Sequence, residues 1–253
     1  MRAPTEGKRR EGRFAETVRT FAVGLLIALV IRTVLFESFN IPSGSMESTL
    51  LVGDYLFVSK YSYGYTHYSL PFSPPLFSGR IFGAEPKRGD IAVFRLPSDD
   101  STSYIKRVIG LPGDKVQMIG GELHINGVAV KREPAADYID TDTGPLPMRV
   151  KRWRETLPNG VSYYTLDRIE SYYDDTPPYL VPPGHFFMMG DNRDNSADSR
   201  VPPSVGGVGF VPFENLIGRA QMIYFSIRDA GPTWQLWNWP RWIRWDRLGM
   251  IVR

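Results

Sequence analysis

Cysteine is missing from the 253 residues of this sequence. Disulfide bonds, thiol catalysis and metal sites built from cysteine are therefore excluded, and an apolar core must stabilise any folded domain. Histidine is scarce: the sequence holds only His67, His124 and His185, none of them in a recognisable hydrolase motif. The G-x-S-x-G sequence of a nucleophile elbow is also missing. A nucleophile activated by histidine is therefore poorly supported.

Net charge is also small. The formal value of +3 is too weak to indicate a nucleic-acid partner. Apolar residues make up 42% of the chain, which is enough for a buried core and excludes global disorder. The 24 glycines, 21 prolines, 13 tyrosines and 14 phenylalanines favour a loop-rich β protein over a helical bundle.

An apolar run near the N-terminus follows five basic residues, Arg2, Lys8, Arg9, Arg10 and Arg13. The run from Val18 to Phe36 counts 19 residues, close to the ~20 needed to cross a bilayer. Arg19 and Arg32 lie near its ends, where long side chains can reach the headgroups. We predict a cytoplasmic basic tail over 1–16 and a transmembrane helix over 17–36, with the rest of the chain outside. No comparable run follows, so a single crossing is expected.

Two other interpretations of this run are weaker. A cleaved signal peptide would end in a small-residue site of A-x-A type, but Glu-Ser-Phe-Asn-Ile-Pro follows the run. A helix lying in the membrane interface needs a polar face, which an almost wholly apolar run lacks.

The remainder favours a mainly β fold. Short β-rich runs bounded by glycine, proline or aspartate predict strands at 55–60, 90–95, 104–109, 185–189 and 217–227. Asn126-Gly127 and Asn159-Gly160 each separate two such runs and predict two-residue hairpin turns. Both turns fall within 115–182, which we interpret as an inserted smaller β domain. The main β core is then expected to comprise 37–114 and 183–230.

The C-terminal segment 231–253 is rich in tryptophan and arginine. It holds five of the six tryptophans, Trp234, Trp237, Trp239, Trp242 and Trp245. A helix beginning at 241 would place its tryptophans beside arginines at 241, 244 and 247. Such adjacent aromatic and basic stripes suit a membrane interface, and a terminal helix packed on its own domain suits them equally well.

Ser45 lies in a serine-rich segment directly after the apolar run, a composition that by itself indicates a turn. Lys106 lies in a β-rich run where Tyr104 and Val108 share its face of the strand. Arg107 is then expected to point outward. Lysine has an ordinary pKa of ~10.4, and burial can lower it by the ~3 units that a base at neutral pH needs. A solvated surface lysine is the alternative.

Two motif matches near these residues are rejected. The letters Ser103-x-x-Lys106 match a penicillin-binding motif, but that pairing needs a helical turn, and these positions face opposite ways on a strand. The segment 190–200 is dense in acidic and amide groups but lacks the spacing and terminal glutamate of a calcium loop. We predict a hydrogen-bonded polar loop there, and no metal.

Five segments, in order, resemble the sequence boxes of bacterial type I signal peptidases. They are SGSM at 43–46, GDYLFVSKYSYG at 53–64, RGDIAVFRLP at 88–97, YIKRVIGLPGD at 104–114 and GDNRDNSADSR at 190–200. Two positions depart from the family pattern. Ser48 stands where the family usually has proline, and Ser103 stands where some members carry an acid.

The resemblance implies a Ser/Lys dyad protease with a mostly β catalytic core and an inserted β domain. It assigns Ser45 as nucleophile, Lys106 as general base and Ser43 as oxyanion donor beside the Ser45 backbone N–H. It implies that Ser196 orients the lysine. A supporting ion pair is implied for Asp198 and Arg200.

The resemblance also implies the substrate and location. Exported preproteins would be cut after an A-x-A-like site, without cofactor or metal, on the periplasmic side of a bacterial inner membrane. Shallow substrate pockets would be lined by Phe39, Ile41, Met46, Leu50, Tyr104 and Ile105, for each of which a core position is the alternative. Two other functions are the alternatives. One is a self-cleaving SOS-response repressor, a soluble class that lacks an N-terminal span, and the other is a membrane-tethered β domain that only binds envelope proteins.

Overall fold

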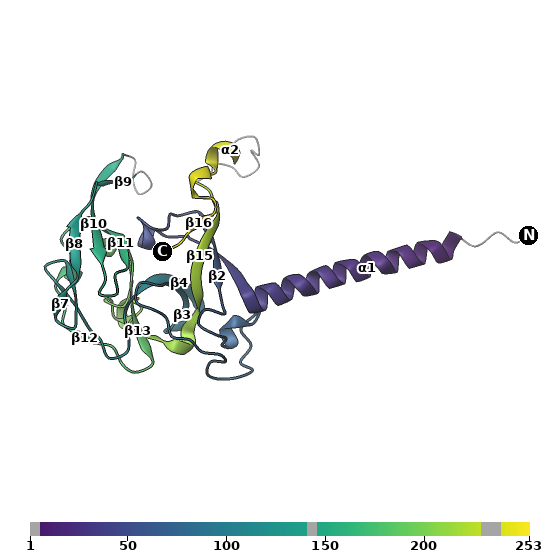
Figure 1. The fold of residues 1–253 in the computed structure, drawn as a ribbon, viewed down its shortest axis with the longest axis horizontal. Coiled ribbons are helices and arrows are strands. Elements are labelled where there is room, and N and C mark those ends of the chain that lie inside the picture. Colours follow the sequence, from purple (N-terminus) through teal and green to yellow (C-terminus); the bar gives the residue numbers. More distant parts are fainter. Residues whose placement is uncertain (1–5, 141–145, 229–238) are drawn as a thin grey trace, which may run out of the picture.

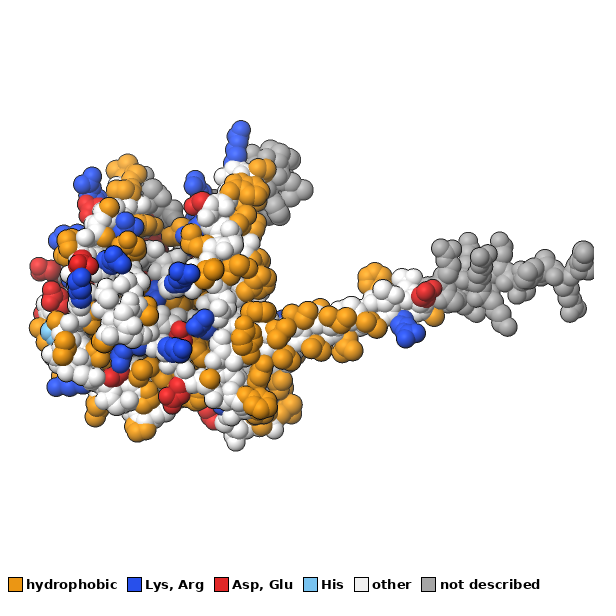
Figure 2. Space-filling model, in the orientation of Figure 1, with side chains coloured by type: hydrophobic (Ala, Val, Ile, Leu, Met, Phe, Trp, Pro, Cys, Tyr) orange, Lys and Arg blue, Asp and Glu red, His pale blue; other side chains and the backbone are white. Residues whose placement is uncertain are grey.

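A long N-terminal helix leads directly into a β body in the computed structural model, which describes residues 6–140, 146–228 and 239–253 (Figure 1). Helix α1 spans Glu6–Val30 and continues as a π-helical turn over Ile31–Leu35. Its apolar stretch, Phe14–Leu35, has 22 residues and a mean hydropathy of 2.0, and none of it is buried. Figure 2 shows these apolar side chains exposed along the helix.

The structure differs from the expected span at its end. Phe36, the expected last residue of the span, instead begins strand β1 and pairs with Ser59. The helical conformation ends there because Phe36 adopts an extended backbone while its N–H still bonds to the carbonyl of Ile31.

The largest sheet has eight antiparallel strands and carries the N-terminal strand at its edge. Its order is β1-β2-β15-β3-β4-β13-β14, and β16 also pairs with β15. The bounds are β1 Phe36–Asn40, β2 Asp54–Ser59, β3 Ile91–Leu96, β4 Asp99–Gly110, β13 His185–Met189, β14 Val211–Pro212, β15 Leu216–Ser226 and β16 Met250–Ile251. The five strands expected from the sequence all lie in this sheet, and the mainly β fold class is confirmed.

Two four-stranded sheets use the strands between 115 and 180. One contains β5 Lys115–Ile119, β6 Glu122–Ile125, β7 Val128–Ala129 and β12 Tyr179–Leu180. The other contains β8 Lys131–Pro134, β9 Tyr138–Asp140, β10 Met148–Thr156 and β11 Ser162–Asp167. Their buried side chains form one cluster with Phe187 and Met189 of β13, so these sheets share a core with the main sheet. The division at 115 and 182 stays a prediction.

The two asparagine-glycine turns differ. Asn126 and Gly127 both have positive φ, +55° and +80°, as a two-residue turn of the predicted type requires. Of the second pair, only Gly160 has positive φ, and Leu157 N–H bonds to Val161 O at 2.9 Å. The prediction of a two-residue turn there is wrong, because the loop closes one residue wider.

Over its described residues, 239–253, the C-terminal segment is no continuous helix. Helix α2 covers only Trp239–Trp242 and is followed by a 3-10 turn over Trp245–Arg247. Arg244 and Arg247 are buried. Arg247 Nε bonds to Asp54 Oδ1 at 2.9 Å, and Arg244 Nη1 bonds to the Val52 carbonyl at 2.8 Å.

The predicted arginine stripe is therefore wrong at Arg244 and Arg247. These two side chains tie the segment to the β body because hydrogen-bond acceptors lie within their reach there. Trp234 and Trp237 lie outside the described residues.

Candidate active site

The turn that carries Ser45 follows directly from the edge strand β1. Ile41 N–H bonds to Asp54 O at 2.8 Å and Gly53 N–H bonds to Ile41 O at 2.9 Å, which closes the end of the β1–β2 pair. A 3-10 turn over Gly44–Met46 comes next and leaves Ser45 only 7% exposed. The nucleophile candidate is thus held by backbone hydrogen bonds within a few residues.

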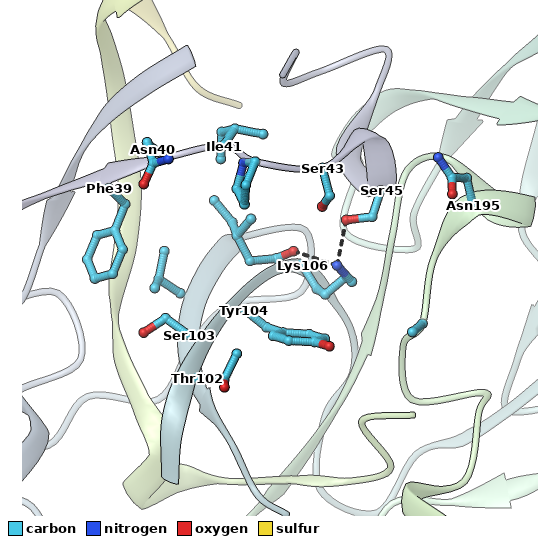
Figure 3. Close-up of a pocket in the computed structure, with 14 residues that line it drawn as sticks. Phe39, Asn40, Ile41, Ser43, Ser45, Thr102, Ser103, Tyr104, Lys106 and Asn195 are labelled. Carbon is cyan, nitrogen blue, oxygen red and sulfur yellow. Dashed lines mark hydrogen bonds between the residues drawn. The ribbon is translucent and has the colours of Figure 1, made fainter. Parts of the chain in front are cut away.

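Lys106 reaches Ser45 from strand β4, 61 positions later in the chain (Figure 3). Its Nζ donates to Ser45 Oγ at 2.7 Å and to the carbonyl of Ile105 at 3.0 Å. The side chain is 4% exposed and lies 5.3 Å from the ring of Tyr104. The shared strand face with Tyr104 thus brings the amine into an apolar setting.

Burial lowers the pKa of Lys106 to about 8, although Asp198 and Asp191 each raise it in part. Removing the ammonium from water disfavours the charged form, and the two carboxylates only partly offset this. About a tenth of such amines are neutral at pH 7. An amine in this state can accept a proton from a hydroxyl.

Arg107 does not point outward, so that prediction is wrong. The residue is fully buried, with Nε 2.8 Å from Asp191 Oδ1 and Nη2 2.7 Å from Asp191 Oδ2. Its guanidinium also lies 4.1 Å from the ring of Tyr163 on β11. Side chains along β4 still alternate between the two faces of the strand. The smaller sheets cover the face on which Arg107 lies.

Asp198 and Arg200 form a buried ion pair. Arg200 Nε and Nη2 each lie 2.9 Å from a different Asp198 oxygen, and Gly190 N–H bonds to Asp198 Oδ2 at 3.0 Å. Burial raises the pKa of Asp198, but Arg200 and the backbone donors outweigh it, so the pKa is lowered overall. The pair holds the polar loop closed beside the Ser45 turn.

Ser196 lies next to that turn and makes no hydrogen bond to Lys106, whose Nζ bonds to Ser45 Oγ and the Ile105 carbonyl. Its buried Oγ has no hydrogen-bond partner among the described residues. A Cβ on Gly190 would lie 2.3 Å from Ser196 Oγ and 2.5 Å from the Ser45 carbonyl. Glycine at 190 therefore lets the polar loop approach the turn this closely.

An open cavity of about 400 Å³ lies against Ser45 and Lys106. Four of the predicted pocket residues line it: Phe39, Ile41, Tyr104 and Ile105. Ser43 is exposed at the same cavity (Figure 3). Other residues that line the cavity were not predicted from the sequence, namely Asn40, Pro42, Val93, Thr102, Ser103, Asn195 and Ala197. Of these, Ala197 could have been found, because its small side chain lies next to Ser196 in the polar loop.

Met46 and Leu50 are core residues. Both are fully buried and pack in a core cluster with Leu56 and Val58 of β2. Neither side chain lines the cavity as it stands, and their assignment to a substrate pocket stays a prediction.

Three further residues hold the Ser45 turn. Asn192 Nδ2 donates to the Gly44 carbonyl at 3.0 Å and to Glu47 Oε2 at 2.9 Å. Arg168, which follows β11, donates to the same Glu47 oxygen at 2.9 Å. The Asn192 N–H bonds to the Ser45 carbonyl at 3.2 Å. No sequence motif indicated these contacts.

Among the described residues, no cluster of three or more histidines or acids could hold a metal.

Comparisons with known proteins show which family the chain resembles. The model of the family "Signal peptidase, peptidase S26" matches residues 14–225. Signal peptidase I of Rickettsia conorii is 45% identical over 249 residues, covering 92% of this chain and 90% of the relative. Signal peptidase I of Rickettsia typhi is 44% identical, with coverages of 92% and 91%.

Among solved structures, a signal peptidase I from Enterococcus faecalis is 25% identical and covers 54% of this chain and 97% of that one. The TM-score between the two structures is 0.31.

Proposed function

Because the chain belongs to the signal peptidase family, peptidase S26, we propose that it cuts signal peptides from exported preproteins with Ser45 as nucleophile and Lys106 as general base. The observation that carries this proposal is the 2.7 Å contact between Lys106 Nζ and Ser45 Oγ at a buried position. An amine is an effective base for a hydroxyl when it is both within hydrogen-bond reach and uncharged.

In the first step, neutral Lys106 accepts the Ser45 proton while Ser45 Oγ bonds to the carbonyl carbon of the scissile peptide. The resulting oxyanion is stabilised by the Ser45 backbone N–H and the Ser43 hydroxyl, which lies exposed at the cavity. Loss of one such donor typically lowers the rate by ~10²–10³-fold. Protonated Lys106 then gives its proton to the leaving amine as the C–N bond breaks.

In the second step, Lys106 takes a proton from water, and the hydroxide attacks the acyl carbon. The ester bond to Ser45 Oγ breaks, and Lys106 returns the proton to that oxygen. We assign Ser196 to orient the amine during these transfers, since its buried hydroxyl lies beside the Ser45 turn and has no hydrogen-bond partner within the described part of the chain. Asp198 and Arg200 keep the loop that carries Ser196 in place.

The cavity supports a site for small side chains. Phe39, Ile41 and Ile105 line it with apolar surface, and its volume of about 400 Å³ is open to solvent on one side. An extended segment with small residues, such as the A-x-A end of a signal peptide, fits a shallow apolar cavity of this kind.

The apolar helix supports membrane anchoring. Its 22-residue apolar stretch is unburied and long enough to cross the ~30 Å hydrocarbon core. We propose one crossing of the bacterial inner membrane, with the N-terminus in the cytoplasm and the β body on the periplasmic side. Within that body, we propose that 115–182 is an insertion in the catalytic core.

Purified protein in detergent micelles provides the test. Wild type should release the mature protein from a preprotein, whereas Ser45→Ala and Lys106→Met should release none above background. Ser43→Ala should retain partial activity. Full activity in either dyad variant would refute the mechanism, and a bound but uncleaved preprotein with wild type would favour the binding-only alternative.

A further inference from the structure

The junction between α1 and the main sheet contains no flexible linker. The helical conformation runs to Leu35, and β1 begins at Phe36. The ring of Phe36 packs edge-on against Tyr61, with centroids 5.7 Å apart. The anchor therefore passes into the catalytic sheet without an unpaired residue between them.

The segment after β2 satisfies the last carbonyls of the helical turn. Lys60 N–H bonds to Leu35 O at 3.0 Å, and Tyr65 Oη donates to Val34 O at 2.9 Å. Carbonyls at a helix end have no partner within the helix, so external donors fix the direction in which it leaves. Both donors here come from the β body.

The buried Lys60 side chain adds an ion pair with the partly exposed Glu37 to this junction. Its Nζ lies 2.8 Å from Glu37 Oε2 on β1 and 2.7 Å from the Ser69 carbonyl, and the residue is 2% exposed. Separating the pair would leave a charge in a dry environment, which is strongly unfavourable. Lys60 thereby joins the first strand to the segment that holds the helix end.

Rigid structure continues from this junction to the nucleophile. All five residues of β1 pair with β2, from Phe36 with Ser59 to Asn40 with Tyr55. Five residues of strand span about 17 Å. The Ile41 hydrogen bonds then lead directly to the Ser45 turn. The distance of Ser45 from the membrane end of the helix is therefore fixed, whereas a flexible linker of the same length would sample many distances.

We propose that the junction formed by Val34, Leu35, Glu37, Lys60 and Tyr65 sets the height of Ser45 above the membrane and thereby selects the cleavage position. This inference rests on the proposed function. A signal peptide is held in the bilayer by its apolar region. The number of residues between that region and the small-residue site sets the height at which the site is presented. Only substrates whose spacing matches the height of Ser45 reach the nucleophile.

The test compares wild type with a variant that carries Gly-Ser-Gly-Ser between Leu35 and Phe36. Both are reconstituted in vesicles and given preproteins whose spacer between apolar region and cleavage site is shortened or lengthened in steps of two residues. A misplacement of about 1 Å can cost ~10²-fold in rate, so wild type should prefer one spacing by about 10-fold or more. The insertion variant should lose this preference or move it to a different spacing.

Three controls make the outcome specific. The same four residues inserted between Pro75 and Leu76, on an exposed loop, should leave the spacing preference unchanged. A soluble peptide that lacks an apolar region should be cleaved equally by all variants, which shows that the β body is folded. Lys60→Met, which removes the ion pair with Glu37 and the hydrogen bond to the Ser69 carbonyl, should broaden the preference while peptide cleavage is kept.

An unchanged spacing preference in the Leu35/Phe36 insertion variant, with normal peptide cleavage, would overturn the inference and leave the proposed function intact. Failure of wild type to cleave any preprotein or the peptide would instead overturn the proposed function.

Discussion

Arg168 bonds to Glu47, two residues after Ser45, with Nη2 and Oε2 2.9 Å apart. Arg168 also bonds Asp140 through Nη1 at 2.6 Å, and both carboxylates are almost completely buried. Arg168, in the segment after β11, thus compensates the charges of Asp140 in the smaller sheets and Glu47 in the Ser45 turn. The smaller sheets therefore contribute to the geometry of the active site.

Arg168→Met should destabilise the protein by about 3 kcal/mol, because it leaves two buried carboxylates without their cation. The Ser45 turn should also shift, lowering kcat by ~10-fold or more with little change in KM. Urea unfolding and steady-state cleavage measure the two effects. Arg149→Met, which removes an exposed pair with Asp137, is the matched control and should change stability by less than ~0.5 kcal/mol. Equal behaviour of the two variants would contradict a role for Arg168.

The cleavage rate should rise with pH and level off above about 8, the pKa to which burial lowers Lys106. The protonated amine cannot accept the Ser45 proton, so activity is lost as pH falls through this value. A pH profile of kcat/KM for a soluble peptide measures it, with Lys115→Met, an exposed lysine, as control. An acid limb near the ordinary lysine pKa of ~10.4 would contradict the burial argument.

Lys106→Met should be inactive and yet more stable than wild type. Between pH 8 and the ordinary lysine pKa the unfolded chain binds more protons at this site than the native state, so wild-type stability rises with pH there. Below pH 8 both states are protonated, and native Lys106 bears the full cost of a buried charge. Removing it should stabilise the protein at pH 7 by about 1–2 kcal/mol. Chemical denaturation at pH 7 and pH 10 checks this, and a variant less stable than wild type at pH 7 would count against it.

Ser48→Pro should destabilise the protein although the family usually has proline there. Ser48 has a φ of +83°, and Thr49 N–H bonds to Met46 O at 3.1 Å, which makes a type II turn. Proline fixes φ near −65° and cannot occupy this position without rearrangement. Ser48→Gly is the matched control, because both variants lose the bond from Ser48 Oγ to the Tyr164 carbonyl. The proline variant should be less stable than the glycine variant by more than ~1 kcal/mol, and equal denaturation midpoints would refute this.

Local patterns in the sequence predicted the elements of the fold. The apolar run indicated the helix, and β-rich runs bounded by glycine and proline indicated the strands of the main sheet. These signals work because they depend on residues close in the chain. The end of the helix at Phe36 depends instead on pairing with Ser59, which no local pattern reveals.

Contacts between segments far apart in the sequence limit how much of the candidate active site can be predicted from the sequence. Strand parity predicted which face Lys106 occupies, but only the family resemblance indicated Ser45 as its partner. The same parity predicted that Arg107 points outward, and it left open whether the C-terminal arginines pack on the domain. Arg107 and Arg247 are buried because Asp191 and Asp54, far away in the sequence, supply matched carboxylates. The burial of Met46 and Leu50 could not be predicted either, because the direction of a side chain in or after a short turn depends on the core beneath it.

The contacts of the Lys106 amine suit both of its protonation states. The ammonium donates one hydrogen to the Ser45 hydroxyl and one to the Ile105 carbonyl, its two partners among the described residues. The neutral amine keeps the bond to the carbonyl and presents its lone pair to the Ser45 hydroxyl, which then donates. In the cation a further hydrogen points to neither partner and can pass to a leaving nitrogen. Such a group should therefore act as an acid in the second half of each step as well as a base in the first.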